Sequence, residues 1–185
     1  EQELYVPAKS AGKVNFGPWS EDAEVDIDTL KSVKSPKDVF FPQSENLYTC
    51  EREGRKLKVE PEALKEQKFT VFGMRACDVQ GVKVLDQVFL ADPVDSFYAA
   101  RREHGTMVAI ACHEPEESCF CKVFGIDCAE PAADVAAWFA GEELYWKALT
   151  EKGQTLTEIL SGLLTDADAE DEKKLSEEQT AIRAI

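Results

Sequence analysis

The sequence predicts one α/β domain, in which helices pack against a mixed β-sheet and N-terminal hairpins form a smaller β portion. Two short runs, residues 69–73 and 107–111, consist mostly of aliphatic and aromatic side chains, as fully buried strands do. The segment between them carries apolar residues at helical spacing, which predicts a β-α-β order. A chain of 185 residues with 44% hydrophobic content is long enough for one such core.

Two hairpins are expected in the N-terminal third of the chain. Residues 1–17 and residues 47–59 both alternate apolar and polar side chains around a glycine-containing turn, which is Gly54 in the second case. We expect Cys50, on the first strand of the second hairpin, to be a small buried hydrophobe. Between the hairpins, residues 35–41 combine a helix cap with a proline at the first helical position and predict one short helical turn.

The later elements follow in chain order. Asp78 can cap a helix whose apolar residues recur at spacings of three and four, and Asp95 precedes a shorter helical stretch. Residues 135–149 predict two strands that extend the sheet as a hairpin. Residues 155–164 have the spacing of an ordinary helix whose aliphatic side chains face the core. We therefore expect a domain over residues 1–164, followed by an acidic and then mixed-charge helical tail or linker over residues 165–185.

Composition and motifs exclude several classes of protein. With 21 basic and 36 acidic residues the net charge is −15, which disfavours nucleic acid and anionic membranes as partners. No stretch approaches the roughly 18 consecutive apolar residues that span a bilayer, and no secretory signal pattern opens the chain, so we expect a cytoplasmic protein. Dinucleotide-binding, P-loop and nucleophile-elbow motifs are absent. The six cysteines are more plausibly cytosolic thiols than three disulfides.

Four cysteines predict a metal centre. Cys77 follows the strand at 69–73 and lies at the start of the next helix, where the helix dipole favours a thiolate. Cys112 follows the strand at 107–111, so two strand ends each supply one thiol at the edge where α/β sheets collect ligands. Cys119 and Cys121 complete the set through a loop that turns at Pro115.

Four thiolates fit a tetrahedral zinc site or a [4Fe–4S] cluster equally well in number. The cluster is favoured because the usual pair of C-x₂₋₄-C zinc knuckles is missing. Phe120 could shield the sulfurs or simply pack, and Arg75 could donate to a sulfur or form a surface ion pair. Cys128 is set aside as spare, since thiolate coordination usually closes at four. A thiol-redox enzyme using Cys119 and Cys121 is the weakest alternative, because its usual pair has C-x-x-C spacing.

Several segments then occur in the order found in a known family. They are Pro-Lys-Asp-Val-Phe-Phe-Pro-Gln (36–43), Phe-Gly-Met-Arg-Ala-Cys-Asp (72–78), Leu-Asp-Gln-Val-Phe-Leu (85–90), Tyr-Ala-Ala-Arg-Arg-Glu (98–103) and the loop from Cys112 to Cys121. The chain resembles the β subunit of sulfhydrogenase-type NiFe hydrogenases and the A subunit of anaerobic sulfite reductase. The resemblance covers most of residues 1–160. One departure is Ala76, where the family has proline.

The resemblance implies a cytoplasmic electron-transfer subunit that catalyses nothing alone. Together with the converging thiols it implies a [4Fe–4S] cluster on Cys77, Cys112, Cys119 and Cys121. The alternative, which rests on the four thiols alone, is a non-catalytic structural module with a zinc site at an assembly interface. The implied partners are flavin-containing and catalytic subunits of a multisubunit anaerobic oxidoreductase. Family members usually carry a C-terminal ferredoxin-like module, so we expect this chain to be the N-terminal domain of a longer protein.

Overall fold

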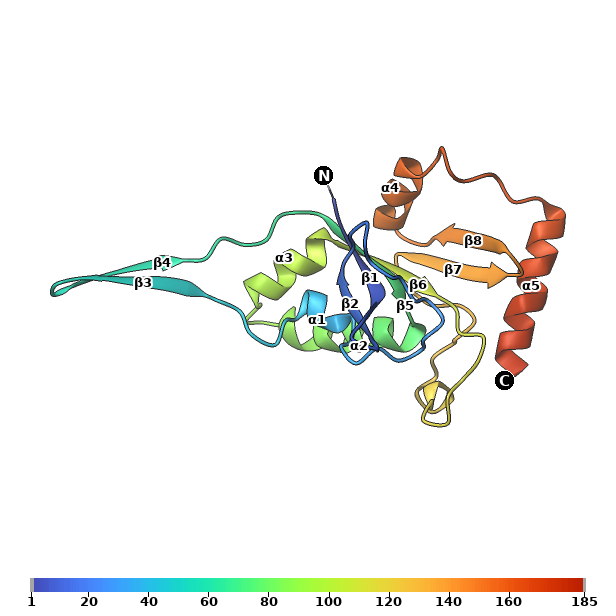
Figure 1. The fold of residues 1–185 in the computed structure, drawn as a ribbon, viewed down its shortest axis with the longest axis horizontal. Helices are drawn as coiled ribbons and strands as arrows, with labels where there is room; N and C mark the ends of the chain where they lie inside the picture. The colour runs from blue at the N-terminus through green and yellow to red at the C-terminus, as the bar shows by residue number, and fades with distance from the viewer. Residues whose placement is uncertain (1, 185) are drawn as a thin grey trace.

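The computed structural model describes residues 2–184 and shows a six-stranded mixed sheet with helices packed against it, plus a separate two-stranded sheet (Figure 1). The predicted fold class is confirmed. The strands of the main sheet are, in spatial order, β2 (Lys13–Pro18), β1 (Glu3–Ser10), β5 (Phe69–Met74), β6 (Gly105–Ile110), β7 (Val135–Ala140) and β8 (Glu143–Ala148). The four inner strands run parallel, and the two edge strands pair antiparallel with their neighbours.

Helices cover both faces of this sheet. They are α1 (Lys37–Phe40), α2 (Ala76–Phe89), α3 (Ser96–His104), α4 (Glu151–Ile159) and α5 (Ala169–Ala184). Helices α1 to α3 enclose a core with Phe69, Val71 and Met107, whereas α4 packs through Leu156 on Val108, which points to the opposite face. The β5-α2-α3-β6 order is the crossover expected between parallel strands.

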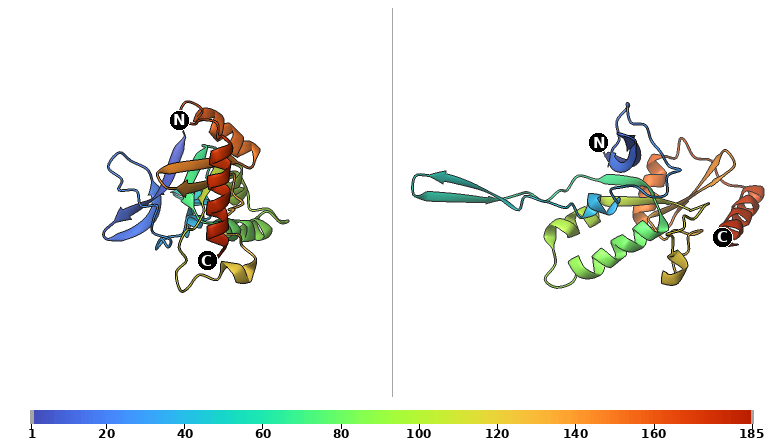
Figure 2. Two further views of the ribbon diagram at one scale, coloured as in Figure 1. Left: turned by 90° about the vertical axis from the view of Figure 1, so that its right-hand side faces the viewer. Right: turned by 60° about the horizontal axis from the view of Figure 1, so that its bottom comes forward.

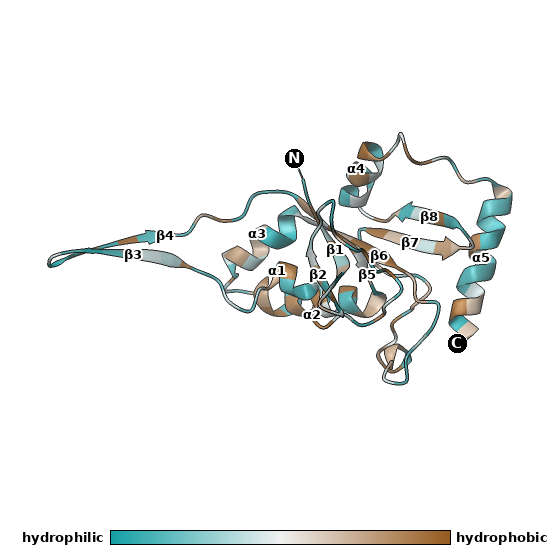
Figure 3. Cartoon of the chain, in the orientation of Figure 1, coloured by the Kyte–Doolittle hydropathy of each residue, from teal (hydrophilic) through white to brown (hydrophobic). Residues whose placement is uncertain are grey.

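The central strands form because nearly every side chain on them is apolar and buried. All residues of β6 are buried, and β5 leaves only Phe72 partly exposed. Figure 3 shows hydrophobic residues concentrated in these central strands. Strands that are covered on both faces need such continuous apolar runs, which is why the sequence predicted both of them.

The first predicted hairpin exists but belongs to the main sheet. Its turn residues Ala11 and Gly12 both have positive φ, as a tight two-residue turn of type I′ requires. Strand β1 also pairs in parallel with β5, in register from Glu3 opposite Phe69. This long-range pairing adds the hairpin to the six-stranded sheet, where the sequence analysis placed it in a smaller β portion.

The second predicted hairpin is also present, and it projects from the body as an arm (Figures 1 and 2). It consists of β3 (Tyr48–Glu53) and β4 (Lys56–Pro61), and every residue of both strands is exposed. The expectation that Cys50 is buried was therefore wrong. Alternation in the sequence indicated one apolar face but could not show that the rest of the chain leaves this face uncovered.

The C-terminal third differs in part from expectation. Strands β7 and β8 form the predicted hairpin, but α4 starts earlier than expected because the Thr150 side chain caps it by accepting a hydrogen bond from Gly153 N. Of the aliphatic side chains expected to face the core, Leu156 is buried, whereas Ile159 and Leu163 are exposed. Helix α5 folds back on β7 and β8 and buries Ile182. A domain boundary at residue 164 stays a prediction.

No helix among residues 2–184 combines the length and the apolar character that crossing a bilayer requires.

Candidate metal centre

Cys77 is placed by the junction between β5 and α2. Arg75 has extended backbone angles, and its N–H donates to the Asp78 carboxylate at 3.1 Å, which fixes the first turn of the helix. Gly73, just before this junction, has φ +90° at a bulge in the pairing with β6. The chain therefore turns sharply from strand to helix, and Cys77 stands in the first helical turn at the end of the sheet.

The Arg75 side chain connects this junction to the end of the next strand. Its guanidinium is buried and donates to the carbonyl oxygens of Ala111, at 3.3 Å, and of Ile27. Because Ala111 immediately precedes Cys112, this contact brings the two strand ends together. The side chain does not form the surface ion pair that the sequence left open.

The loop after Cys112 is closed by its own backbone. Cys112 N donates to Cys128 O at 3.2 Å, so the loop returns to its starting point. A short 3₁₀ turn over Cys121–Phe124 ends at Gly125, whose φ of +65° suits glycine, and Ile126 N then donates to Cys121 O at 3.0 Å. These contacts hold Cys121 and Cys128 next to each other.

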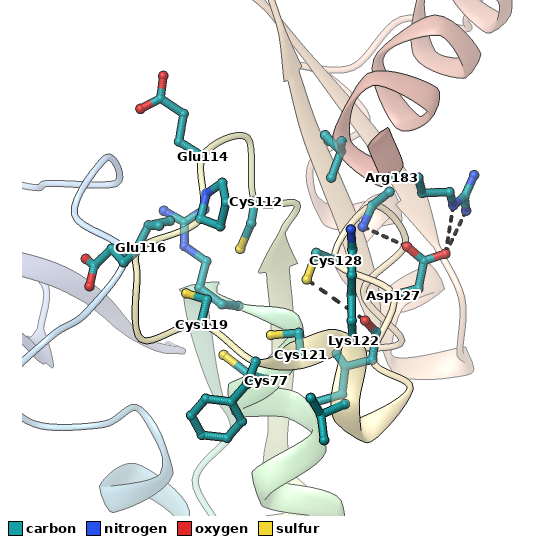
Figure 4. Close-up of a pocket in the computed structure, with 18 of the residues that line it drawn as sticks. Cys77, Cys112, Glu114, Glu116, Cys119, Cys121, Lys122, Asp127, Cys128 and Arg183 are labelled. Atoms are coloured by element: carbon teal, nitrogen blue, oxygen red, sulfur yellow. Dashed lines mark hydrogen bonds and ion pairs between the residues drawn. The ribbon is translucent and has the colours of Figure 1, made fainter. Parts of the chain in front are cut away.

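Five thiols line one pocket of about 510 Å³ at this edge of the sheet. They are Cys77, Cys112, Cys119, Cys121 and Cys128. Figure 4 shows their sulfur atoms facing a common space between the two loops. Among the described residues, no three His, Cys, Asp or Glu side chains lie close enough to share one metal ion. The thiols thus share one pocket, which is where a bound group would meet them.

Burial raises the pKa of four of these thiols, Cys77, Cys112, Cys121 and Cys128, and so favours their protonated form. Partial burial raises the pKa of the Cys77 thiol to about 11, and the charges of Asp78 and Cys121 act in the same direction. Burial also raises the pKa of Cys112 to about 11, although the Arg75 charge opposes this shift. The thiolate that the start of α2 was expected to favour is thus disfavoured. A cationic group bound between the thiols would favour their thiolate form.

Four cationic side chains line the pocket: Lys31, Arg75, Lys122 and Arg183. Lys31 pairs with Glu116 at 2.9 Å and contacts Ser118, and both residues belong to the Cys112–Cys128 loop. The hydrogen bond that the Lys31 ammonium donates to Glu116 is the main cause of the raised Lys31 pKa, and the Glu116 charge acts in the same direction. With buried Arg75, Lys31 provides positive charge beside the thiols in an otherwise acidic protein.

The structure brings together the four predicted cysteines and adds Cys128, which the sequence analysis set aside. Its spacing of seven residues from Cys121, equal to that between Cys112 and Cys119, was the available signal. Phe120 lines the pocket but is 61% exposed and lies against Phe124, with ring centroids 5.6 Å apart. It therefore gives the thiols little shelter from solvent within this chain.

Helix α5 closes the far side of the pocket. Ile182 and Arg183 line it, and Arg183 donates to the Asp127 carboxylate at 2.9 Å and to Glu130 at 3.2 Å. His113 points away from the thiols and pairs through Nδ1 with Glu178 at 2.8 Å, again on α5. The other histidine, His104, contacts Ala100 O within its own helix. Neither histidine lines the pocket.

Comparison with known proteins gives one significant match. Over 132 residues the chain is 30% identical to sulfhydrogenase 2 subunit beta of Pyrococcus furiosus. The match covers 71% of this chain and 38% of that protein, so the chain spans well under half the length of the relative. No family model and no solved structure gives a significant match. The similarity confirms the resemblance to sulfhydrogenase β subunits that the sequence motifs indicated.

Proposed function

We propose that this chain, a relative of a sulfhydrogenase β subunit, holds one [4Fe–4S] cluster and passes single electrons within a multisubunit oxidoreductase such as a hydrogenase or sulfite reductase. The observation that carries the proposal is the convergence of thiols from two adjacent strand ends on one pocket. The proposed ligands are Cys77, Cys112, Cys119 and Cys121. When bound, the cluster would supply a centre that accepts and releases one electron at a time.

The sequence pattern of the thiols supports a cluster over zinc, because the usual pair of C-x₂₋₄-C zinc knuckles is missing. A tetrahedral zinc site with Zn–S bonds near 2.3 Å brings its sulfurs to roughly 3.8 Å from one another. In this chain the thiols come from two loops and line one pocket. A cuboidal cluster takes each thiolate on a different iron and therefore suits ligands that surround a wider space.

The surrounding residues suit an anionic iron–sulfur group. Arg75 and Lys31 supply positive charge beside the thiols, and net charge and hydrogen bonding around a cluster set its reduction potential. Arg75 is held by two backbone carbonyls, so its charge stays in place when the group changes oxidation state. The chain itself would bind no substrate. Its proposed partners are a flavin- or ferredoxin-containing electron carrier and a catalytic subunit.

Anaerobic purification tests this proposal. We expect about four irons and four sulfides per chain and an electron paramagnetic resonance signal from the reduced protein. Less than about one iron per chain after reconstitution, with no such signal, would contradict the proposal. Stoichiometric zinc in a colourless protein would instead identify a structural site on the same thiols.

A further inference from the structure

The β3–β4 arm has two chemically different faces. Residues directly opposite each other in an antiparallel pair point to the same side, and the pairing places Tyr48, Cys50 and Arg52 opposite Pro61, Val59 and Leu57. That face is therefore apolar except for Arg52. The other face carries the pairs Thr49 with Glu60, Glu51 with Lys58 and Glu53 with Lys56. Alternation of this kind is typical of a strand pair with one buried side.

The apolar face is nevertheless uncovered. Tyr48 is 61% exposed, Leu57 64% and Val59 53%. The arm is a sheet of its own, and it stands away from the body in every view (Figures 1 and 2). A two-stranded hairpin is marginally stable at best in water without a surface to pack on. The missing surface must come from outside the described chain.

The turn and the base of the arm both have the regular geometry of a β-hairpin. Its two-residue turn has Gly54 at the first position with φ +59°, as a type II′ hairpin turn requires. At its base, Glu62 N donates to Leu47 O at 3.0 Å, and the Thr49 hydroxyl donates to Glu62 at 3.1 Å. The charged face carries three acidic and two basic side chains, and Lys58 pairs with Glu60 at 2.8 Å within β4. The apolar face is therefore the side of the arm that is available to a partner protein.

More exposed apolar side chains lie near the base of the arm. Phe41, seven residues before the arm begins, stacks on Phe89 with ring centroids 4.3 Å apart. Around Phe89, the outer side of α2 and the loop after it expose Val88 (61%) and Val94 (54%). A partner that receives the arm can also cover this patch.

The size of the arm decides between a second copy and a different protein. Six residues per strand give an apolar face of roughly 20 by 10 Å, or about 200 Å². Two arms packed on each other would bury far less than the roughly 800 Å² per partner of a stable interface. A larger body with a cleft that takes the arm and also covers the base of α2 buries more.

We propose that the arm anchors this chain in a different polypeptide of the same complex, through a cleft lined by aliphatic and aromatic side chains. This proposal rests on the proposed function only in that the chain is one subunit of an assembly. The thiol pocket lies at the opposite end of the molecule from the arm tip (Figure 1). A partner seated on the arm therefore leaves the pocket open for electron exchange.

The test is assembly of the native complex around an arm variant. Leu57→Glu together with Val59→Glu puts two charges on the apolar face, and we expect the tagged chain to retain its partner subunits about tenfold less than the wild type. The matched control, Glu51→Gln with Lys58→Gln, changes the charged face of the same strands and should retain them fully. Wild-type subunit stoichiometry in the Leu57/Val59 variant would overturn the proposal.

Two further measurements make the result specific. Cys50 should be alkylated about tenfold more slowly in the native complex than in the isolated chain, and equal rates would overturn the proposal. The isolated wild type should be a monomer by light scattering; a dimer that the Leu57/Val59 variant abolishes would assign the face to a second copy and overturn it too. Iron content is measured separately: a wild type without a cluster contradicts the proposed function and leaves the assembly result interpretable.

Discussion

The thiol pocket and the β3–β4 arm differ in how the rest of the fold supports their side chains. At the pocket, each thiol follows a buried strand or lies on a loop that backbone hydrogen bonds close. The buried Arg75 side chain joins the two strand ends by donating to Ala111 O. In the arm every residue is exposed. The comparison shows that a buried scaffold gathers the thiols at one pocket, whereas the arm leaves both faces of a hairpin uncovered.

The largest expected difference concerns iron. Replacing Cys112 by Ser should reduce the iron bound after anaerobic reconstitution to a small fraction of the wild-type value, because one ligand of four is lost. Cys50→Ser on the arm should leave iron binding unchanged. Cys128→Ser is the sharper control, since Cys128 lines the same pocket. Full iron loss in this variant and normal loading in Cys77→Ser would exchange these two residues in the ligand set.

The second difference concerns stability. Phe69 is 1% exposed at the start of β5, and Phe69→Ala should lower the free energy of unfolding by about 3–5 kcal/mol. Leu57→Ala on the arm removes a side chain that touches little, so the isolated chain should change by less than about 0.5 kcal/mol. Urea denaturation of the isolated proteins measures both. A loss of several kcal/mol at Leu57 would mean that the arm packs on its own chain.

Gly73→Ala tests the strand-to-helix turn before Cys77. The φ of +90° strains any residue with a Cβ, and an added Cβ would lie 3.0 Å from Pro7 Cδ. We expect a loss of about 1–3 kcal/mol together with slower iron uptake, because the start of α2 shifts. The matched control is Gly54→Ala at the arm turn, which also has positive φ but open space. It should cost stability without changing iron uptake.

A smaller effect is expected at the ion pair between α2 and α3. Arg102 Nε donates to Asp86 Oδ1 at 2.6 Å, and the Tyr98 hydroxyl donates to the same oxygen at 2.7 Å. Burial alone would raise the Asp86 pKa, but these hydrogen bonds and the Arg102 charge leave it below its usual value. Asp86→Asn should therefore cost about 1–2 kcal/mol at neutral pH, allowing for partial exposure.

The pH dependence of that loss follows from the lowered pKa. A carboxyl group with a lower pKa in the folded state stabilises the fold above its ordinary pKa, and this contribution disappears as pH falls through the folded value. The difference in unfolding free energy between wild type and Asp86→Asn should thus shrink below about pH 4. A difference that stays constant from pH 7 to pH 3 would show that the charge of Asp86 contributes nothing.

Periodicity in the sequence was sufficient for most of the fold. The runs at 69–73 and 107–111 predicted β5 and β6 because both faces of these strands are covered, and the cysteines that follow them were expected at one edge of the sheet. Local sequence patterns could not show which elements pack against each other. The pairing of β1 with β5, the exposure of Cys50 and the return of α5 onto β7 all depend on contacts distant in sequence.

The sequence predicted most of the cysteines of the candidate site, but it did not predict the burial and the charges around them. Cys128 was set aside because thiolate coordination usually closes at four, and its place at the pocket follows from a fold in which Cys112 N donates to Cys128 O. The direction of the Cys77 pKa shift was also missed, since the helix start was weighed without the burial that opposes it. Lys31, more than forty residues before the first of these cysteines, could be placed at the pocket only by the fold.

Native mass spectrometry of the anaerobically purified chain tests the central claim most directly. The account predicts a mass increase equal to four irons and four sulfides on one chain, lost when Cys112 is replaced by Ser. A chain that carries a single zinc ion, or that binds no metal under conditions where its relatives are loaded, would contradict it.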